Sequence, residues 1–259
     1  MRIVVLTKPV PDTASSGERL RPDDMRLDRA AVPAVVNAND EYALEAALKL
    51  TEAGGGEVIL LSMAPPSAPE TMRKALAMGA ARGTLVTDPA LAGADTVTTT
   101  RVLAAALKDM EYDLVFAGAD TSDGGAGVVP AGVATILGLP YLSYAAKIEP
   151  DEATRTVHVR RISPTGFDVL EAPMPTMIVC TQALGEPRYP SLKGIMAARS
   201  KELTLKSLGD VDGAEASPST TAVVAATAPP PRAATRVIRG PADEAAQQVV
   251  AFLVERRIV

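Results

Sequence analysis

Four short runs of apolar and β-branched residues, separated by segments of helical periodicity, constrain the fold of this chain most strongly. The runs occupy residues 2–6 (RIVVL), 57–62 (EVILLS), 83–87 (GTLVT) and 112–117 (YDLVFA). Buried strands that alternate with helices are typical of a parallel sheet built from βα units. The sequence therefore predicts an α/β fold with a doubly wound, mostly parallel sheet.

Between these runs lie segments in which apolar residues are spaced as in a helix, each with a residue that can start or stop a helix. The helical segments span residues 40–53, 68–78 and 95–110. Asn39 is expected to cap the first helix, Gly54 to Gly56 to end it, and Gly79 to end the second. A fourth helix is predicted over residues 127–137, because the adjoining sequence GLP stops it.

Strand-like runs then succeed one another without helices between them. They lie near residues 142–148, 155–162 and 167–171. This close spacing predicts an antiparallel extension on one edge of the sheet.

The last fifty residues differ in composition from the rest. Residues 210–235 are rich in Ala, Pro, Ser and Thr, which predicts a linker or extended tail. Helical spacing returns over residues 242–256, so the tail is expected to end in a docked helix. We therefore expect a nucleotide-binding α/β domain over residues 1–209, then a linker and a C-terminal helix over residues 210–259.

The composition argues against several functional classes. A net charge of −5 disfavours nucleic-acid binding, because phosphate neutralisation needs a basic face. The single cysteine, Cys180, excludes an intrachain disulfide, and its apolar run TMIVC predicts core packing. The single histidine, His158, leaves almost no material for a Ser-His-Asp triad or a histidine metal cluster, and is expected on a strand surface.

Hydropathy also bears on location. No apolar run approaches the ~18 residues of a membrane span. The run before Thr7 is too short for the core of a signal peptide. A cytoplasmic protein is therefore expected.

The loop over residues 118–132 (GADTSDGGAGVVPAG) is the strongest candidate for ligand binding. It comes after the fourth predicted strand, holds five glycines from Gly118 onward, and leads into a helix. Glycines let backbone amides approach a phosphate, and a helix start favours an anion. The spacing fits neither a P-loop nor a dinucleotide fingerprint. Phosphate binding and a merely flexible turn both remain open.

Three other loops at the same edge of the sheet offer ligand groups. Lys8, in the loop over residues 7–13, is suited to an anion but also to plain solvation. The amides of NAND (37–40) suit a base or ribose edge, although Asn at a helix start is often only a cap. Met63, in MAPP, offers an apolar wall. Since no loop joins a nucleophile to a base, the residues alone indicate a nucleotide-binding module without a catalytic constellation.

The stretch GEPRYPSLKGIMAAR (185–199) predicts an extended arm that ends in a short helix. Its two prolines exclude helix and central strand, and Ser191 can cap the short helix that starts at Leu192. Leu192, Ile195 and Met196 fall on one helical face, beside basic Arg188. A partner-recognition device and a loop folded back on its own core are both compatible with this pattern.

Five of these motifs, in this order, resemble the small or beta subunit of electron transfer flavoproteins, the FixA-like group. The motifs are KPVPD (8–12), NANDEYALEAALKL (37–50), ALAMGAARG (75–83), YDLVFAGADTSDGGAGVVPAGVATILGLP (112–140) and GEPRYPSLKGIMAA (185–198). The resemblance covers about residues 1–210. It implies a sheet of the adenine nucleotide alpha hydrolase type and a heterodimer with an alpha subunit that holds most of the FAD. It also implies a structural AMP in this chain.

The resemblance assigns roles to particular residues. It implies an AMP pocket at Leu6, Asn37, Ala38, Asn39, Asp40, Met63, Asp123, Gly124, Gly125, Ala126, Gly127, Val128, Val129, Pro130 and Ala131, to which the loop chemistry adds Lys8 and Gly118. It places Thr13 and Arg161 near the FAD ring. It makes the arm (183–200) a recognition loop for acyl-CoA or related dehydrogenases, through Arg188, Tyr189, Pro190, Leu192, Ile195 and Met196, with Leu192 as the anchor.

The chain is therefore expected to be an electron carrier subunit rather than a stand-alone enzyme, passing electrons toward a quinone reductase, with its C-terminal helix packed on the alpha subunit. Ile162 stands where the family is often acidic, and NAND replaces the more usual Asn-Pro-Phe/Tyr-Asp/Cys. Two alternatives remain open. One is a bifurcating version with a second FAD in the AMP site, and the other is a stand-alone adenine-nucleotide-binding protein.

Overall fold

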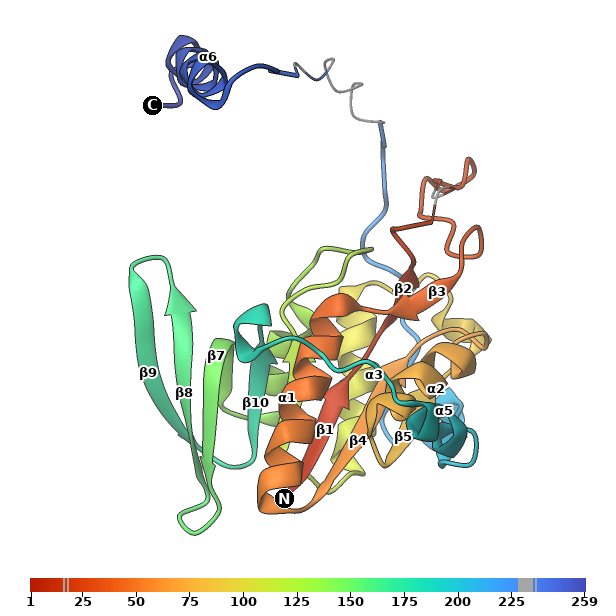
Figure 1. Ribbon diagram of the computed structural model, residues 1–259. Coiled ribbons are helices and arrows are strands. Elements are labelled where there is room, and N and C mark those ends of the chain that lie inside the picture. The colour runs from red at the N-terminus through yellow and green to blue at the C-terminus, as the bar shows by residue number, and fades with distance from the viewer. Residues whose placement is uncertain (16, 18, 228–234, 236) are drawn as a thin grey trace. The chain divides into compact units, whose positions relative to one another are not determined.

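The computed structural model describes residues 1–15, 17, 19–227, 235 and 237–259 (Figure 1). Contacts divide the chain into two compact units, residues 1–223 and residues 224–259, which are described separately. The strands of the first unit are β1 (Arg2–Leu6), β2 (Pro9–Pro11), β3 (Ala34–Val36), β4 (Glu57–Met63), β5 (Arg82–Val86), β6 (Leu114–Gly118), β7 (Tyr141–Asp151), β8 (Thr156–Ser163), β9 (Gly166–Pro173), β10 (Thr176–Cys180) and β11 (Leu203–Lys206). Its α-helices are α1 (Ala38–Gly54), α2 (Pro69–Met78), α3 (Thr96–Lys108), α4 (Val129–Leu137) and α5 (Leu192–Ala198).

Nine of these strands form one sheet in the order β11-β5-β4-β1-β6-β10-β7-β8-β9. From β11 to β7 every neighbouring pair is parallel. The predicted doubly wound, mostly parallel sheet is confirmed. The four strands expected from the sequence are β1, β4, β5 and β6, each within two residues of the predicted bounds.

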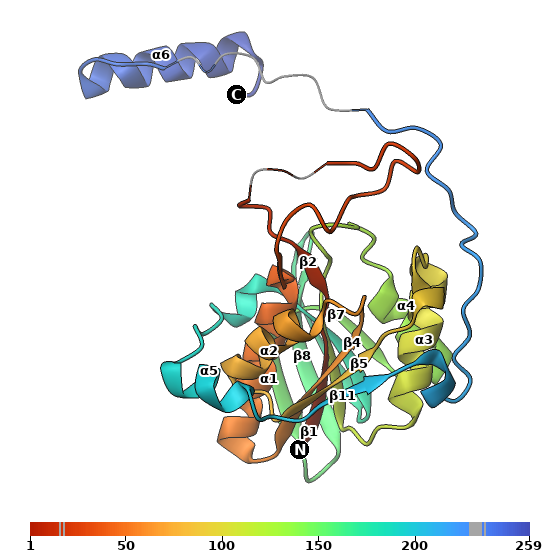
Figure 2. The ribbon, with the colours of Figure 1, turned by 90° about the vertical axis from the view of Figure 1, so that its right-hand side faces the viewer.

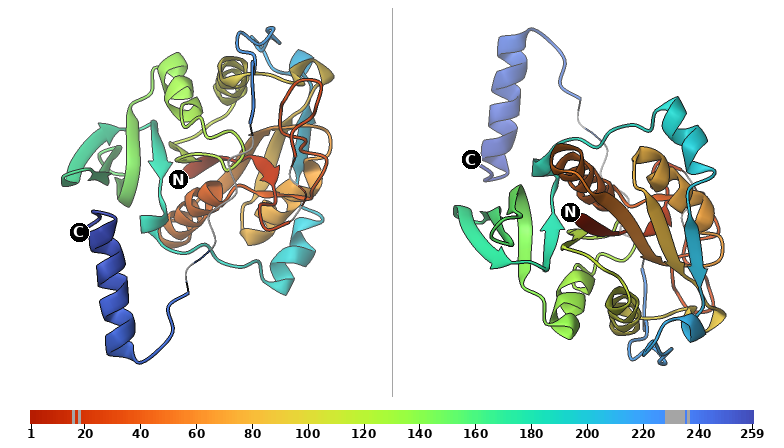
Figure 3. Two further views of the ribbon diagram at one scale, coloured as in Figure 1. Left: turned by 90° about the horizontal axis from the view of Figure 1, so that it is seen from above. Right: turned by 90° about the horizontal axis from the view of Figure 1, so that it is seen from below.

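Helices cover both faces of the sheet, as the views along its strands show (Figure 3). Ile3 and Val5 of β1 pack with α1 and α2 on one face. Val4 and Leu6 pack with α3 and α4 on the other. Because side chains alternate along a strand, a run such as RIVVL must be apolar at every position when both faces are covered. Cys180 is fully buried, as predicted, and this burial raises the pKa of its thiol.

The predicted antiparallel extension is confirmed. β7, β8 and β9 pair antiparallel at one edge and extend beyond the helices (Figure 1). The sequence pattern did not predict where this extension joins the sheet. β10 lies between β6 and β7 and is parallel to both, so the chain returns into the sheet after the hairpins. His158 lies partly exposed on β8, as expected.

Two helix starts differ from the predictions by two residues, and one small sheet was missed. α4 begins at Val129 rather than residue 127, because Gly127 has a φ of +60° and Pro130 occupies the first turn. α1 begins at Ala38 rather than Asp40. β2 and β3 pair antiparallel between β1 and α1, where only a loop was predicted over residues 7–13.

The start of the predicted linker is tied to the domain. Val211 is buried, and Thr220 donates from its amide and its hydroxyl to Asp95, each at 2.9 Å. Asp95 also caps α3 by accepting from the Thr98 amide. Residues 211–227 contain no helix or strand, while residues 228–234 of the predicted linker lie outside the described residues.

The second unit contains α6 (Ala242–Glu255), which confirms the helix expected near residues 242–256. Its docking on a partner stays a prediction. No helix in the described part of the chain has the length and apolar character needed to cross a membrane.

Candidate functional site

The strand order places a topological switch point at β1. The chain passes from β1 to β4 on one side and later enters β6 on the other side of β1. In open α/β sheets, ligands bind at the carboxyl ends of the strands that flank such a point. Leu6 ends β1 and Gly118 ends β6. The residues predicted from the loops therefore meet at one edge of the sheet.

Gly118 allows the start of α1 to approach the end of β6. A Cβ at this position would lie 2.5 Å from the Oδ1 of Asp40 and 2.6 Å from the backbone carbonyl carbon of Asn39. Neither neighbour can move freely, because Asp40 is buried and its carboxylate accepts the amide of Lys8 at 2.8 Å. Only glycine fits this close contact.

Burial dominates the electrostatics of Asp40 and raises the pKa of its carboxyl to about 7. Hydrogen bonds from Asn37 and from the backbone amides of Lys8 and Gly118, together with the charge of Lys8, oppose this rise. The switch point thus contains a carboxyl group that titrates near neutral pH.

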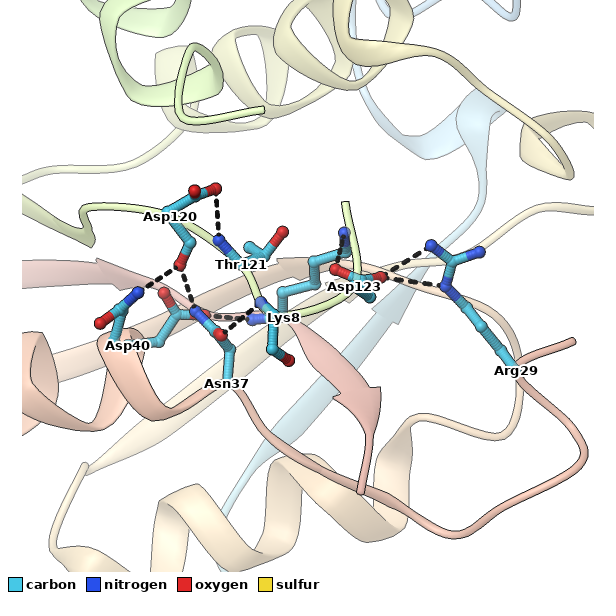
Figure 4. Close-up of polar contacts among 9 residues, drawn as sticks. Lys8, Arg29, Asn37, Asp40, Asp120, Thr121 and Asp123 are labelled. Atoms are coloured by element: carbon cyan, nitrogen blue, oxygen red, sulfur yellow. Dashed lines mark hydrogen bonds and ion pairs between the residues drawn. The ribbon is translucent and has the colours of Figure 1, made fainter. Parts of the chain in front are cut away.

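Asn37, which is labelled in Figure 4, and Asn39 fix the loop after β6. Their side-chain amides donate to the carbonyl oxygen of Asp120 at 2.8 and 3.0 Å. The Ser122 amide donates back to the Asn37 Oδ1 at 3.3 Å. The prediction that Asn39 caps α1 is wrong. Asn37 occupies the N-cap position, and its side chain does not cap the helix because its Oδ1 accepts the Ser122 amide of the loop instead.

Asp123 is the charged centre of that loop (Figure 4). Its buried carboxylate accepts the Nζ of Lys8 at 2.8 Å and the Nη2 of Arg29 at 2.7 Å. Burial by itself raises the pKa of Asp123, but hydrogen bonds and charge from Lys8, with a further hydrogen bond from Arg29, hold it at about 2. The sequence had suggested Lys8, whereas Arg29 was missed because nothing in its neighbourhood points to a partner 94 residues away.

Beyond Asp123 the loop opens to solvent. Gly125 and Gly127 have φ values of +57° and +60°, which favour glycine. Residues 124–128 are exposed, and no side chain caps the N-terminus of α4 at Val128. Amides at an uncapped helix start carry partial positive charge and lack partners. This segment, which includes the predicted residues from Gly124 to Ala131, suits an anion such as phosphate.

The apolar members of the predicted pocket lie at the ends of neighbouring strands. Leu6 is buried at the end of β1, and Met63 is partly buried at the end of β4. Both pack with the core cluster under α3 and α4. They line the same edge of the sheet as the glycine-rich loop.

The two residues expected near a flavin belong to other elements. Thr13 is exposed in the turn after β2. Arg161 lies on β8, where its Nη2 donates to Asp168 of β9 at 2.7 Å. Among the described residues, neither forms a hydrogen bond or ion pair with the residues at the switch point.

The arm has a fixed stem and an exposed tip. α5 lies beside α2 and projects away from the sheet (Figure 2). Ser191 caps α5 as predicted, accepting from the Gly194 amide at 3.0 Å. Tyr189, Leu192 and Met196 are 96%, 76% and 66% exposed, and Ile195 is also exposed. Arg188 points instead to α1, where it pairs with Glu45 and Glu52.

Comparison with known proteins identifies the family. The electron transfer flavoprotein domain family matches residues 24–210. Over 266 residues, which cover 100% of both chains, the protein is 36% identical to the electron transfer flavoprotein subunit beta of Thermoanaerobacterium thermosaccharolyticum. The chain belongs to the electron transfer flavoprotein beta-subunit family.

Other members of this beta-subunit family carry different names. The caffeyl-CoA reductase-Etf complex subunit CarD of Acetobacterium woodii is 36% identical over 268 residues, again across 100% of both chains. Protein FixA of Azorhizobium caulinodans is 41% identical over 216 residues, which cover 81% of this chain and 76% of FixA. The chain is therefore a flavoprotein subunit of electron transport, and membership of the beta subunits implies an alpha-subunit partner.

Proposed function

We propose that this chain is the small subunit of a heterodimeric electron transfer flavoprotein. It binds AMP as a structural nucleotide at the switch point and helps to enclose the FAD held mainly by the alpha subunit. Its arm docks acyl-CoA or related dehydrogenases, whose electrons pass on to the respiratory chain through a quinone reductase. The subunit carries electrons within the complex and is not a stand-alone catalyst.

One observation carries the AMP assignment. The open glycine-rich loop, the uncapped start of α4 and the ends of β1, β4 and β6 converge at the switch point. Residues 124–128 are exposed, and their backbone amides suit the phosphate apart from that of Gly125, which donates to the Thr121 carbonyl oxygen at 3.0 Å. Leu6 and Met63 offer apolar surface to the base. The side-chain amides of Asn37 and Asn39 donate to the Asp120 carbonyl oxygen, so we assign these residues the role of shaping the loop.

A second observation supports the docking assignment. The arm exposes Tyr189, Leu192, Ile195 and Met196 together on one short segment. Exposed apolar residues gathered in this way are typical of a protein–protein contact. Arg161, held by Asp168 on the antiparallel extension, is the cation that we assign to the FAD side, with Thr13 nearby in the assembled complex.

The test is the nucleotide content of the complex. The chain is co-expressed with its alpha subunit, the purified complex is denatured, and the released nucleotides are quantified by chromatography with mass detection. One FAD and one AMP per heterodimer support the proposal. Two FAD molecules without AMP replace it with the bifurcating version. A chain that purifies alone with an adenine nucleotide and no flavin partner refutes the carrier role.

A further inference from the structure

Arg188 lies in the stem of the arm, and among the described residues its hydrogen bonds and ion pairs are all with α1. Its Nε donates to the Glu45 Oε2 at 2.7 Å, its amide donates to the same oxygen at 3.2 Å, and its Nη2 donates to the Glu45 Oε1 at 3.2 Å. The guanidinium also pairs with Glu52, two turns further along the helix. The planar guanidinium of Arg188 thus donates hydrogen bonds to two carboxylates at once.

Glu45 requires this cation. Its side chain is only 5% exposed, and its other ion pair, with Lys49, is longer at 3.5 Å. A buried carboxylate without a cation is strongly unfavourable. Removing the guanidinium therefore leaves the Glu45 carboxylate with only the longer ion pair to Lys49, which favours a rearrangement of the stem or uptake of a proton.

Further contacts fix the C-terminal end of the arm on α2. A Cβ at Gly194 would lie 2.4 Å from the Ala77 carbonyl oxygen, so α5 sits directly against the end of α2. The Nη1 of Arg73 donates to the Ala198 and Lys201 carbonyl oxygens at 2.6 and 2.8 Å. The Nζ of Lys201 donates to the Leu76 and Ala80 carbonyl oxygens at 2.9 and 2.6 Å. At the N-terminal end of the arm, Arg188 makes the corresponding attachment to α1.

We propose that Arg188 is a positioning residue of the docking arm. By binding Glu45 and Glu52 it holds the stem on α1, so that Leu192 is presented in one orientation before a dehydrogenase arrives. A pre-organised contact loses less conformational entropy on binding than a mobile one. This inference rests on the proposed docking function, but the state of the arm can be measured without any dehydrogenase.

The first test is amide hydrogen exchange of residues 185–199 in the full chain co-purified with its alpha subunit. In Arg188→Gln, exchange over residues 188–195 should rise by about 10- to 100-fold, the range expected for losing a charge-assisted hydrogen bond. Lys193→Gln is the matched control, since Lys193 is an exposed cation of the arm without an ion pair among the described residues, and it should change exchange by less than about twofold. Unchanged exchange in Arg188→Gln overturns the proposal.

The second test separates positioning from direct contact with the partner. If Arg188 acts through Glu45, then Glu45→Gln raises the KM of a dehydrogenase for the flavoprotein as Arg188→Gln does, and the double variant is no worse than either. Multiplied effects, or a normal KM in Glu45→Gln, mean that Arg188 touches the dehydrogenase and overturn the positioning role. If Arg188→Gln fails to fold, Arg188→Lys and Glu52→Gln give smaller changes in the same direction.

The docking function has its own separate outcome. A normal KM in Leu192→Ala refutes docking through the arm, whereas the exchange result for Arg188→Gln still decides whether the stem is held by α1. The two failures are therefore distinguishable.

Discussion

Gly118→Ala tests how closely α1 and β6 approach at the switch point. The added Cβ would lie 2.5 Å from the Asp40 Oδ1, 2.6 Å from the Asn39 carbonyl carbon and 2.7 Å from the Asn39 Cβ. Real Cβ atoms essentially never come this close, so the helix start must shift. That shift lengthens the hydrogen bond from the Lys8 amide to Asp40, which is 2.8 Å in the native arrangement.

The size of the effect depends on the atoms involved. Overpacking a well-packed site costs about 1–3 kcal/mol, and backbone atoms that cannot turn aside favour the upper end. For a protein of this length a loss of about 3 kcal/mol lowers Tm by about 6–12 °C. The same shift displaces Asn37 and Asn39, which position the loop through Asp120, so AMP content should fall as well.

The assay is thermal unfolding of the heterodimer at one fixed concentration, and then nucleotide quantification. Gly209→Ala is the control, because the nearest atom to its Cβ is 3.8 Å away and its φ lies outside the left-handed region. It should unfold within about 2 °C of the wild type. A Gly118→Ala protein with the same Tm and full AMP content would refute the reasoning.

Three further predictions concern other parts of the molecule. Leu192→Ala should raise the KM of a dehydrogenase for the flavoprotein about tenfold or more, with FAD and AMP content unchanged, because the variant loses the exposed side chain that we propose to be the docking anchor. Asp123→Asn should lower the free energy of unfolding by about 1–2 kcal/mol and speed proteolysis of the loop, since Lys8 and Arg29 lose their shared carboxylate while their exposure limits the cost. Burial raises the pKa of Asp40 to about 7, against about 3.9 for an unfolded aspartate, so the native state binds more protons between these values and Asp40 reduces stability as pH rises through them. The free energy of unfolding of Asp40→Asn, measured relative to the wild type by urea unfolding, should therefore rise by about 2 kcal/mol between about pH 5 and pH 7.

Each of these has a control and a contrary result. For the anchor, Leu205→Ala removes another exposed leucine, on β11, and should leave the KM unchanged; equal effects in both variants argue against docking through the arm. For the loop, Ser122→Ala changes an exposed neighbour, and equal stability losses argue against the role of Asp123. For Asp40, parallel pH profiles of wild type and variant mean that its carboxyl does not titrate in this window.

Much of the fold is set by short-range signals that the sequence carries directly. The runs that became β1, β4, β5 and β6 are apolar at almost every position because helices cover both faces of the sheet. The glycine stop at Gly79 and the Ser191 cap act within one helical turn, so they were predicted correctly. The resemblance of five ordered motifs predicted the family, which the domain match over residues 24–210 confirms.

The candidate site was predicted only in part. Loops after parallel strands meet at one edge whatever their lengths, so Lys8, Asp40 and Gly118 could be placed together before the topology was known, whereas Leu6 was assigned by the family resemblance. The sequence could not reveal that Asn37 and Asn39 serve Asp120 instead of capping α1, because a cap and a loop contact need the same residue type.

The sequence by itself determined the alternation of strands and helices, the glycine-rich loop at a helix start, and the arm with its apolar tip. Only the tertiary structure decided which distant groups meet. Arg29 reaches Asp123 across 94 residues, Arg188 reaches Glu45 across 143, and Thr220 reaches Asp95 across 125. The position of β10 between β6 and β7 likewise depends on the tertiary structure. Local propensities depend on neighbours within a turn or two, whereas a long-range partner is set by the path of the whole chain around the sheet, and no single segment encodes that path.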